Sequence, residues 1–303
     1  MELQKTPVGP PLVAVMNYNG QSFQDLPASP GFGWTGNGSI RVREEPNGDL
    51  IYEDEFGQAL RWSLQAGNYI PYLPDNYSDA EKVVGNPSYV YAITFPDQSR
   101  REFDVNGKIL RELDRNNNTA TYSPNPDGSL NSITDATLRT LVFGYGTRTD
   151  GQPVSISSNG RQIQFVYYPD THPVSPNRLQ AIIDPVGDTQ SFVYSVDGLL
   201  EQVIDTRGNV AKRYTYDNLG RKLSEQDYDQ SVIFYDYLET FGLPGVAVTQ
   251  VDLTADPDPD RSRVTFYDLR FRAVEIDELV DPVGPVVNTT LMAYTDGVLL
   301  SFC

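Results

Sequence analysis

Cysteine and histidine are nearly missing from this sequence. Its 303 residues include one cysteine, Cys303, and one histidine, His172. A single cysteine excludes an intrachain disulfide, so packing and strand pairing must stabilise the fold. One histidine and one cysteine also fall short of the usual zinc ligand set, because such sites take three or four of these residues. The sequence therefore predicts no metal site, no cofactor and no catalytic residue.

Long apolar runs and an excess of basic residues are missing too. No stretch approaches the roughly 18 apolar residues of a membrane-spanning helix, so none is predicted. The chain has 23 Lys and Arg against 41 Asp and Glu, and its net charge of -18 argues against nucleic acid as a partner. Residues 1–20 also lack the pattern of a secretory signal. This predicts retention in the cell, export by a specialised secretion system, or origin in a longer chain.

Tyrosine, phenylalanine and glycine are what the sequence does contain. It has 19 Tyr, 13 Phe, 24 Gly and 22 Pro. Aromatic residues favour strands, whereas Gly and Pro favour the turns between them. The composition therefore predicts an all-β protein whose strands are separated by tight turns.

Turn residues recur at a nearly constant spacing. The residues that begin a second turn lie 21 to 26 positions apart, at Asp114, Asp135, Ser158, Asp184, Asp205, Asp227, Asp252 and Asp277. This period is typical of stacked supersecondary units. Each unit reads as two antiparallel strands and two turns, and a two-stranded hairpin is barely stable alone in water. The units are therefore predicted to pair edge to edge into one coiling sheet.

The unit "YSVDGLLEQVIDTRGN", from Tyr194, shows how the turns are built. Asp197 is predicted to cap the first turn through its side chain, and Gly198 to supply a positive φ. Asp205 is predicted to open the second turn, where Gly208 tolerates the left-handed region.

The stretch "YTYDNLGR" is predicted to return this unit to the next one. Tyr214 and Tyr216 share one face of the strand, and we expect them to be rungs of a cross-strand aromatic ladder. Asp217 and Gly220 are predicted to build the following turn, with a positive φ at Gly220.

Three segments carry a family resemblance. "FDVNGKILRELDRNNN", "YSVDGLLEQVIDTRGN" and "YTYDNLGRKLSEQD" resemble the YD repeats of Rhs (rearrangement hotspot) proteins, whose relatives include insecticidal toxin-complex C components and teneurins. "SPGFGWTGNGSIRV" is similar to the segment that leads into the repeats of many Rhs proteins. The predicted organisation is an N-terminal β segment over residues 1–90 and about eight repeats over residues 91–303, the last one incomplete.

The resemblance implies a fold and a role. Such repeats form a YD-repeat array of antiparallel hairpins, a continuous coiling sheet that makes a partial β-shell or cocoon. The implied protein is not an enzyme, and it is part of the encapsulating shell of an Rhs-type polymorphic toxin or cell-surface protein, secreted or exposed on the cell. Its implied partners are an enclosed toxin domain or further repeats of the same shell.

The chain departs from the family pattern at its two "DPVG" sequences, which begin at Asp184 and Asp281. Neither continues into the motif near which some bacterial relatives cleave themselves. Both are predicted to be degenerate second turns of a repeat.

Two other functions fit the residues. Tyrosines exposed on a concave sheet would stack on sugar rings, as in a carbohydrate-binding or adhesive module that recognises a cell-surface glycan. Paired carboxylates would serve a β-propeller-like hydrolase. The ladder is favoured over the sugar site because the aromatic residue recurs in each repeat.

The residues that could carry chemistry are predicted to have structural roles or none. His172, in the loop "PDTHPVSPN", is predicted to be a solvent-exposed loop residue. Cys303 ends the chain and is not expected to be held against a base. "DPDPDR", which starts at Asp256, lacks the Gly and Glu of a calcium loop, so a solvated acidic insertion is predicted.

The cluster "YEDEFGQ" brings Glu53, Asp54 and Glu55 together in the sequence. Neighbours on a strand point to opposite faces, so we do not expect these carboxylates to form a catalytic pair.

Overall fold

The protein is built from strands and tight turns. The computed structural model describes residues 9–20, 31–73, 76–83 and 85–237, and the strand segments 246–251, 262–267, 273–279, 286–295 and 298–302. In these residues the regular structure consists of strands β1 to β26 and the short 3₁₀ helix η1 (Asn37–Ser39). Two compact units, Met1–Thr189 and Gln190–Cys303, are called unit 1 and unit 2. The predicted all-β class is confirmed.

The N-terminal part of unit 1 forms two small antiparallel sheets. In the first, β1 (Met16–Tyr18) pairs with β2 (Trp34–Gly36). The second, called the N-terminal sheet, has four strands in chain order: β3 (Arg41–Glu44), β4 (Leu50–Glu53), β5 (Ala59–Gln65) and β6 (Asn68–Pro71).

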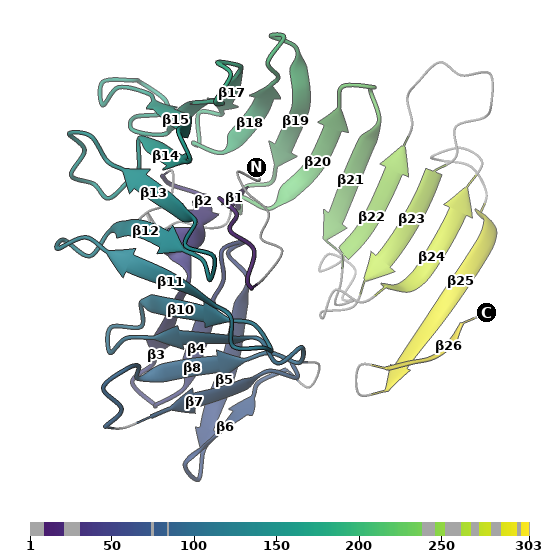
Figure 1. The fold of residues 1–303 in the computed structure, drawn as a ribbon. Helices are drawn as coiled ribbons and strands as arrows, with labels where there is room; N and C mark the ends of the chain where they lie inside the picture. Colours follow the sequence, from purple (N-terminus) through teal and green to yellow (C-terminus); the bar gives the residue numbers. More distant parts are fainter. Residues whose placement is uncertain are drawn as a thin grey trace. The chain divides into compact units, whose positions relative to one another are not determined.

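The rest of unit 1 is one long antiparallel sheet, called the repeat sheet, in which each strand pairs with the next (Figure 1). Its strands are β7 (Asp79–Lys82), β8 (Tyr91–Thr94), β9 (Arg100–Phe103), β10 (Ile109–Leu113), β11 (Thr119–Pro124), β12 (Leu130–Thr134), β13 (Thr140–Gly144), β14 (Ser155–Ser158), β15 (Arg161–Tyr167) and β16 (Leu179–Ile183). The predicted array of antiparallel hairpins is therefore confirmed. The division at residue 90 stays a prediction.

Unit 2 continues the same antiparallel pairing of consecutive strands. Its strands are β17 (Thr189–Tyr194, which begins at the unit boundary), β18 (Leu200–Ile204), β19 (Val210–Tyr216), β20 (Lys222–Asp227), β21 (Val232–Tyr237), β22 (Val246–Val251), β23 (Ser262–Tyr267), β24 (Ala273–Leu279), β25 (Val286–Thr295) and β26 (Val298–Phe302).

One turn recurs at the ends of the hairpins. The Asp217 N–H donates to the Arg221 carbonyl, and the Gly220 N–H donates to the Asp217 carbonyl, at 2.9 and 3.1 Å. The Asp217 carboxylate accepts the N–H groups of Leu219 and Arg221. Gly220 has a φ of +74°, so its predicted positive φ is confirmed. This is a type I turn followed by a left-handed residue, the usual three-residue hairpin loop.

The same pair of carboxylate hydrogen bonds closes turns in both units. It is repeated by Asp54, Asp104, Asp114, Asp135, Asp184 and Asp205. Ser158 instead begins a two-residue turn, with φ of +49° at Asn159 and +73° at Gly160. The predicted second turns from Asp114 to Asp227 are thus confirmed.

Two turn predictions are wrong. Asp277 lies inside β24, opposite Val264, and opens no turn. No residue suited to the left-handed region follows it three positions later, where the chain has Val280. In the unit from Tyr194, the cap is Ser195 rather than Asp197: the Ser195 hydroxyl accepts the Leu199 N–H, and the Ser195 backbone closes the turn. The predicted turns at Asp252 and Asp281 lie outside the described residues.

Tyrosine hydroxyl groups tie successive strands together. Each donates to the carbonyl of a residue 14 to 16 positions earlier in the chain: Tyr145 to Leu130, Tyr167 to Pro153, Tyr216 to Leu200, and Tyr237 to Lys222. The bonds measure 2.6 to 3.0 Å. The recurring tyrosine is therefore a strap between strands as well as an apolar ring.

The predicted aromatic ladder takes a mixed form at Tyr214. The Lys222 ammonium lies 5.7 Å from the Tyr214 ring centre and 4.6 Å from that of Tyr235. The same cation is therefore near both rings, and cation–π attraction adds to the packing.

The N-terminal sheet lies against the repeat sheet within unit 1. The rings of Tyr52 and Phe103 meet edge to face at 6.0 Å. The Val42 N–H donates to the Gly107 carbonyl at 2.8 Å, and the Trp62 indole donates to the Ser78 carbonyl at 3.0 Å. Side chains on both sides are fully buried, among them Trp62, Phe103, Leu50 and Ile93.

Candidate functional site

The three neighbouring carboxylates of the N-terminal sheet have separate roles. Glu53 forms an ion pair with Arg41. Asp54 closes its own turn by accepting the N–H groups of Phe56 and Gln58. Glu55 bonds to Arg101 of the repeat sheet. The three carboxylates thus have different partners, and the expectation that they form no catalytic pair stays a prediction.

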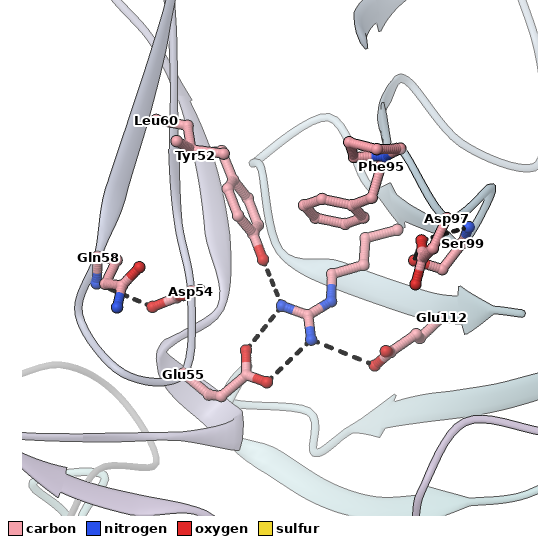
Figure 2. A pocket seen from close by; sticks show the side chains of 11 residues that line it. Tyr52, Asp54, Glu55, Gln58, Leu60, Phe95, Asp97, Ser99 and Glu112 are labelled. Atoms are coloured by element: carbon pink, nitrogen blue, oxygen red, sulfur yellow. Dashed lines mark hydrogen bonds and ion pairs between the residues drawn. The ribbon is translucent and has the colours of Figure 1, made fainter. Parts of the chain in front are cut away.

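Arg101 is the centre of the strongest candidate site. Its guanidinium donates to both carboxylate oxygens of Glu55, at 2.7 and 2.9 Å, and to the Tyr52 hydroxyl. Glu112 lies 3.5 Å from the same guanidinium. Figure 2 shows Tyr52, Glu55 and Glu112 converging on one guanidinium group beside the Phe95 ring. These four side chains with Arg101 are called the Arg101 cluster.

The elements that bring the cluster together come from both sheets. Tyr52 lies in β4 and Glu55 in the turn that follows it, whereas Arg101 is on β9. Glu112 on β10 is the direct cross-strand partner of Arg101. Opposite charges placed across an antiparallel pair attract, and here the N-terminal sheet adds a second carboxylate to that pair.

The cluster borders an open cavity of about 490 Å³. Besides the cluster, its walls include Asp54, Asp97, Ser99 and Leu60. The side chains of Arg101, Glu55 and Glu112 are only 11%, 15% and 20% exposed, so their charges are largely removed from water.

Burial and the guanidinium act against each other on the two glutamates. Burial tends to raise the pKa of Glu55, but the hydrogen bonds and charge of Arg101 outweigh it and hold that pKa below its usual value. For Glu112 burial prevails over the charge of Arg101, and the pKa is raised. Burial also raises the pKa of Asp54. One guanidinium thus serves two carboxylates unequally.

The other face of β9 carries the opposite arrangement. Glu102 is 4% exposed and bonds to both Arg100 and Arg111. Arg100 also pairs with Glu81 on β7. Adjacent residues of one strand therefore take part in two ionic groups, one with surplus acid and one centred on a single acid.

A second ionic group lies in unit 2. Glu225 on β20 pairs with Lys212 of β19 and, at 2.7 Å, with Lys222 of its own strand. Lys212 also contacts Asp227 at 2.9 Å. Burial tends to raise the pKa of Glu225, but the two lysines overcome it and lower that pKa.

Sequence reasoning missed Arg101, Glu112 and Glu225. A signal was present in the repeat register. The position five residues after the turn glycine holds Ile133 and Val203 in two repeats but Glu112 and Glu225 in two others. A charge where sister repeats hold an aliphatic residue indicates a buried or half-buried partner of opposite sign.

His172 was predicted to be exposed to solvent, and the structure shows that it is only partly exposed. Its ring is half-buried and lies 4.4 Å from that of Tyr168. The His172 Nδ1 accepts the Ser175 N–H at 2.9 Å, so the imidazole caps its own loop. Cys303 and the acidic stretch that begins at Asp256 lie outside the described residues.

The described part of the chain offers neither a metal-binding group nor a membrane-spanning helix. It holds no group of three or more His, Cys, Asp or Glu side chains placed to bind a metal ion. None of its helices is long and apolar enough to cross a membrane.

Comparison with known proteins gives similarity to solved structures alone. No family model and no curated protein matches the chain. A crystal structure of TcdB2-TccC3-Cdc42 matches 88% of this chain at 13% identity, with a TM-score of 0.29. TcdB2-TccC3 without its hypervariable C-terminal region matches 87% at 15% identity, with a TM-score of 0.30. TcdB2-TccC3-TEV matches 88% at 11% identity, with a TM-score of 0.26.

The chain is much shorter than these proteins, because the matches cover 21%, 18% and 22% of their lengths. The superpositions are loose, so the strand order and turns of this chain carry its fold assignment. The matched structures are of Tc toxin B and C components, and the chain is similar to part of them.

Proposed function

We propose that this chain is a non-catalytic structural protein, a section of the wall of an Rhs-type β-shell that is exported from the cell or exposed on its surface. The observation that carries the proposal is the recurring way in which the hairpins are closed. The same aspartate turn and the same tyrosine strap recur from repeat to repeat. In a wall every repeat must pair with the next one, so the same closing contacts are expected in each repeat. A catalytic or binding site would instead be built from residues that one repeat has and the others lack.

The charged groups of the candidate site fit this proposal. Glu53, Glu55 and Arg101 each bind a neighbouring strand or turn. Side chains that hold strands together are committed to structure, and a general acid or base must instead face its substrate. The resemblance to Rhs proteins supports an enclosed toxin domain, or further repeats, as the partner.

The proposal is tested by expressing residues 1–303 together with the coding sequence that flanks them in the gene. We expect a protease-resistant particle whose electron-microscopy density has a wall of paired strands around an inner domain. The same preparation is applied to a glycan array. A chain that stays open and binds one glycan, and loses that binding in Tyr72→Ala or Tyr77→Ala, would be an adhesive module instead. These two tyrosines are 66% and 63% exposed.

A further inference from the structure

The Arg101 cluster links two sheets through one cation and two acids. Glu55 belongs to the N-terminal sheet, and Arg101 and Glu112 belong to the repeat sheet. Arg101 gives Glu55 two short hydrogen bonds and stays 3.5 Å from Glu112. The single positive charge of Arg101 can neutralise only one of the two glutamates. One buried negative charge is therefore left over when Glu55 and Glu112 are both ionised.

The surplus charge lies on the repeat-sheet side. The position of Glu112 holds Glu225 beside two lysines in one other repeat. In two others it holds Ile133 and Val203, which are buried and neutral. A protonated Glu112 resembles those neutral residues and no longer repels Glu55. The contact between the sheets then depends on the Arg101–Glu55 pair alone.

We propose that the Arg101 cluster is a lock between the N-terminal sheet and the repeat sheet, and that it closes more tightly when Glu112 takes up a proton. The inference concerns this contact alone and holds whatever the shell encloses. The charged and titratable groups that face the guanidinium come from every element packed around it: Tyr52 of β4, Asp54 and Glu55 of the next turn, Asp97 of the β8–β9 turn, Glu112 of β10 and Tyr122 of β11.

The two glutamates give the lock opposite responses to pH. The pKa of Glu112 is raised in the closed state, so closure gains stability as the pH falls toward and through that pKa. The pKa of Glu55 is lowered, so its contribution is present above the ordinary value of 4.5 and is lost as the pH falls through its lower pKa. Closure is therefore tightest in mild acid, above about pH 4.5.

The Val42 amide reports this contact directly, because it donates across the interface to the Gly107 carbonyl. The experiment measures its hydrogen-exchange protection by NMR on the full chain at pH 8 and pH 5, corrected for intrinsic exchange. We expect the protection of Val42 to be several-fold higher at pH 5 than at pH 8, because protonation of Glu112 then favours the closed contact. The Leu141 amide, within the repeat sheet, serves as the internal reference.

Three variants decide the proposal. Glu112→Gln is expected to show the high protection already at pH 8 and to lose the pH response. Glu55→Gln is expected to lose at least about tenfold at both pH values, since an unpaired Arg101 stays buried. Glu81→Gln is the matched control on the other face of β9, where it pairs with Arg100, and should leave Val42 unchanged.

Two outcomes would overturn the lock. One is lower Val42 protection in Glu112→Gln, which would make Glu112 an equal partner of Arg101. The other is a pH response that survives in Glu112→Gln and disappears in Asp54→Asn, which would assign the proton to Asp54. Both variants keep the Arg101–Glu55 pair, so the decision stands even if Glu55→Gln does not fold.

Discussion

Strands β12 and β20 hold the same place in their repeats and bury different side chains. The two inward positions of β12 hold Leu130 and Ile133, which are 8% and 3% exposed. In β20 these positions hold Lys222 and Glu225, which pair with each other at 2.7 Å. Each strand follows a glycine of positive φ, Gly128 in one case and Gly220 in the other.

This difference shows that turn closure and side-chain burial are independent features of the repeat. The turns are closed by hydrogen bonds between residues at most four positions apart, so they form whatever the strand buries. The inward positions depend on what lies over the strand. In unit 1 the N-terminal sheet lies against the repeat sheet, through contacts such as that of Tyr52 with Phe103. In β19 and β20, by contrast, every residue is half-buried or exposed.

A charge placed at the inward position of β12 is the strongest test of this contrast. Ile133→Glu would put a carboxylate at a position that is 3% exposed and now holds an aliphatic side chain. We expect a loss of about 3–5 kcal/mol in the free energy of unfolding, because the new charge would be buried. The measurement is urea denaturation followed by circular dichroism. Asn131→Glu, at an exposed position of the same strand, is the control and should change stability little. Equal losses in the two variants would contradict the assigned burial.

Substitutions at the turn glycines test the same contrast by steric crowding instead of by a buried charge. Gly107 and Gly220 have φ of +75° and +74°. A Cβ on Gly107 would lie 1.7 Å from the Val42 carbonyl oxygen, in the covering sheet. Gly220→Val is expected to cost about 1 kcal/mol or more from backbone strain. Gly107→Val should cost about 1–3 kcal/mol more, because overpacking adds to that strain.

Thermal denaturation of both glycine variants checks this prediction. Gly208→Val is a further control, since nothing lies within 4 Å of the Cβ it would gain. It should match Gly220→Val if strain alone acts there. A smaller loss for Gly107→Val than for Gly220→Val would mean that the N-terminal sheet is not held at that turn.

Substitution of Glu225 tests whether the stability of β20 depends on the ion pairs of Glu225 with Lys212 and Lys222. Glu225→Gln leaves Lys212 and Lys222 without their shared acid, and we expect a loss of about 1 kcal/mol because the group is partly exposed to solvent. The pKa of Glu225 is lowered, so its contribution is present above the ordinary value of 4.5 and is lost as the pH falls through its lower pKa.

The check is the difference in unfolding free energy between wild type and Glu225→Gln at pH 7 and at pH 3. We expect the difference to shrink at the lower pH. The double variant Lys222→Leu with Glu225→Ile should be as stable as wild type or more so, since an apolar pair can replace an ion pair. A strongly destabilised double variant would assign the charges a role beyond pairing.

The smallest predicted effect is a gain. Leu138 occupies the left-handed position of its turn, with a φ of +64°, and is 84% exposed. Glycine adopts this conformation without steric cost, so Leu138→Gly is expected to stabilise unit 1 by about 0.5–1 kcal/mol. The melting temperature measures it. Val105→Gly, in another exposed turn but without positive φ, should not show the gain.

Particular residues show how far the sequence could predict this fold. Asp114, Asp135, Asp184 and Asp205 were placed at turns correctly, because each precedes a Gly, Asn or Leu in the left-handed region and binds only its own neighbours. Asp277 was misplaced because its spacing fits the period but its following residues do not form that turn. Local chemistry was therefore a better guide than spacing.

The candidate site was less predictable. Glu53, Asp54 and Glu55 were found as a cluster, but their partners were not. Arg101 lies 46 residues from Glu55 in the sequence. The residues around each of them contain no pattern that predicts the other as its partner. The charge at Glu112, where sister repeats hold aliphatic residues, was the one visible sign of a partner.

The all-β class, the hairpins and most of their turns could be predicted from the sequence, because they depend on hydrogen bonds and backbone preferences within a few residues. The tertiary structure alone decided which strands are covered, and that Arg101 serves one carboxylate of its own sheet and one of the N-terminal sheet. Burial and long-range charge pairing depend on which sheet faces which. No pattern within a single repeat contains that information.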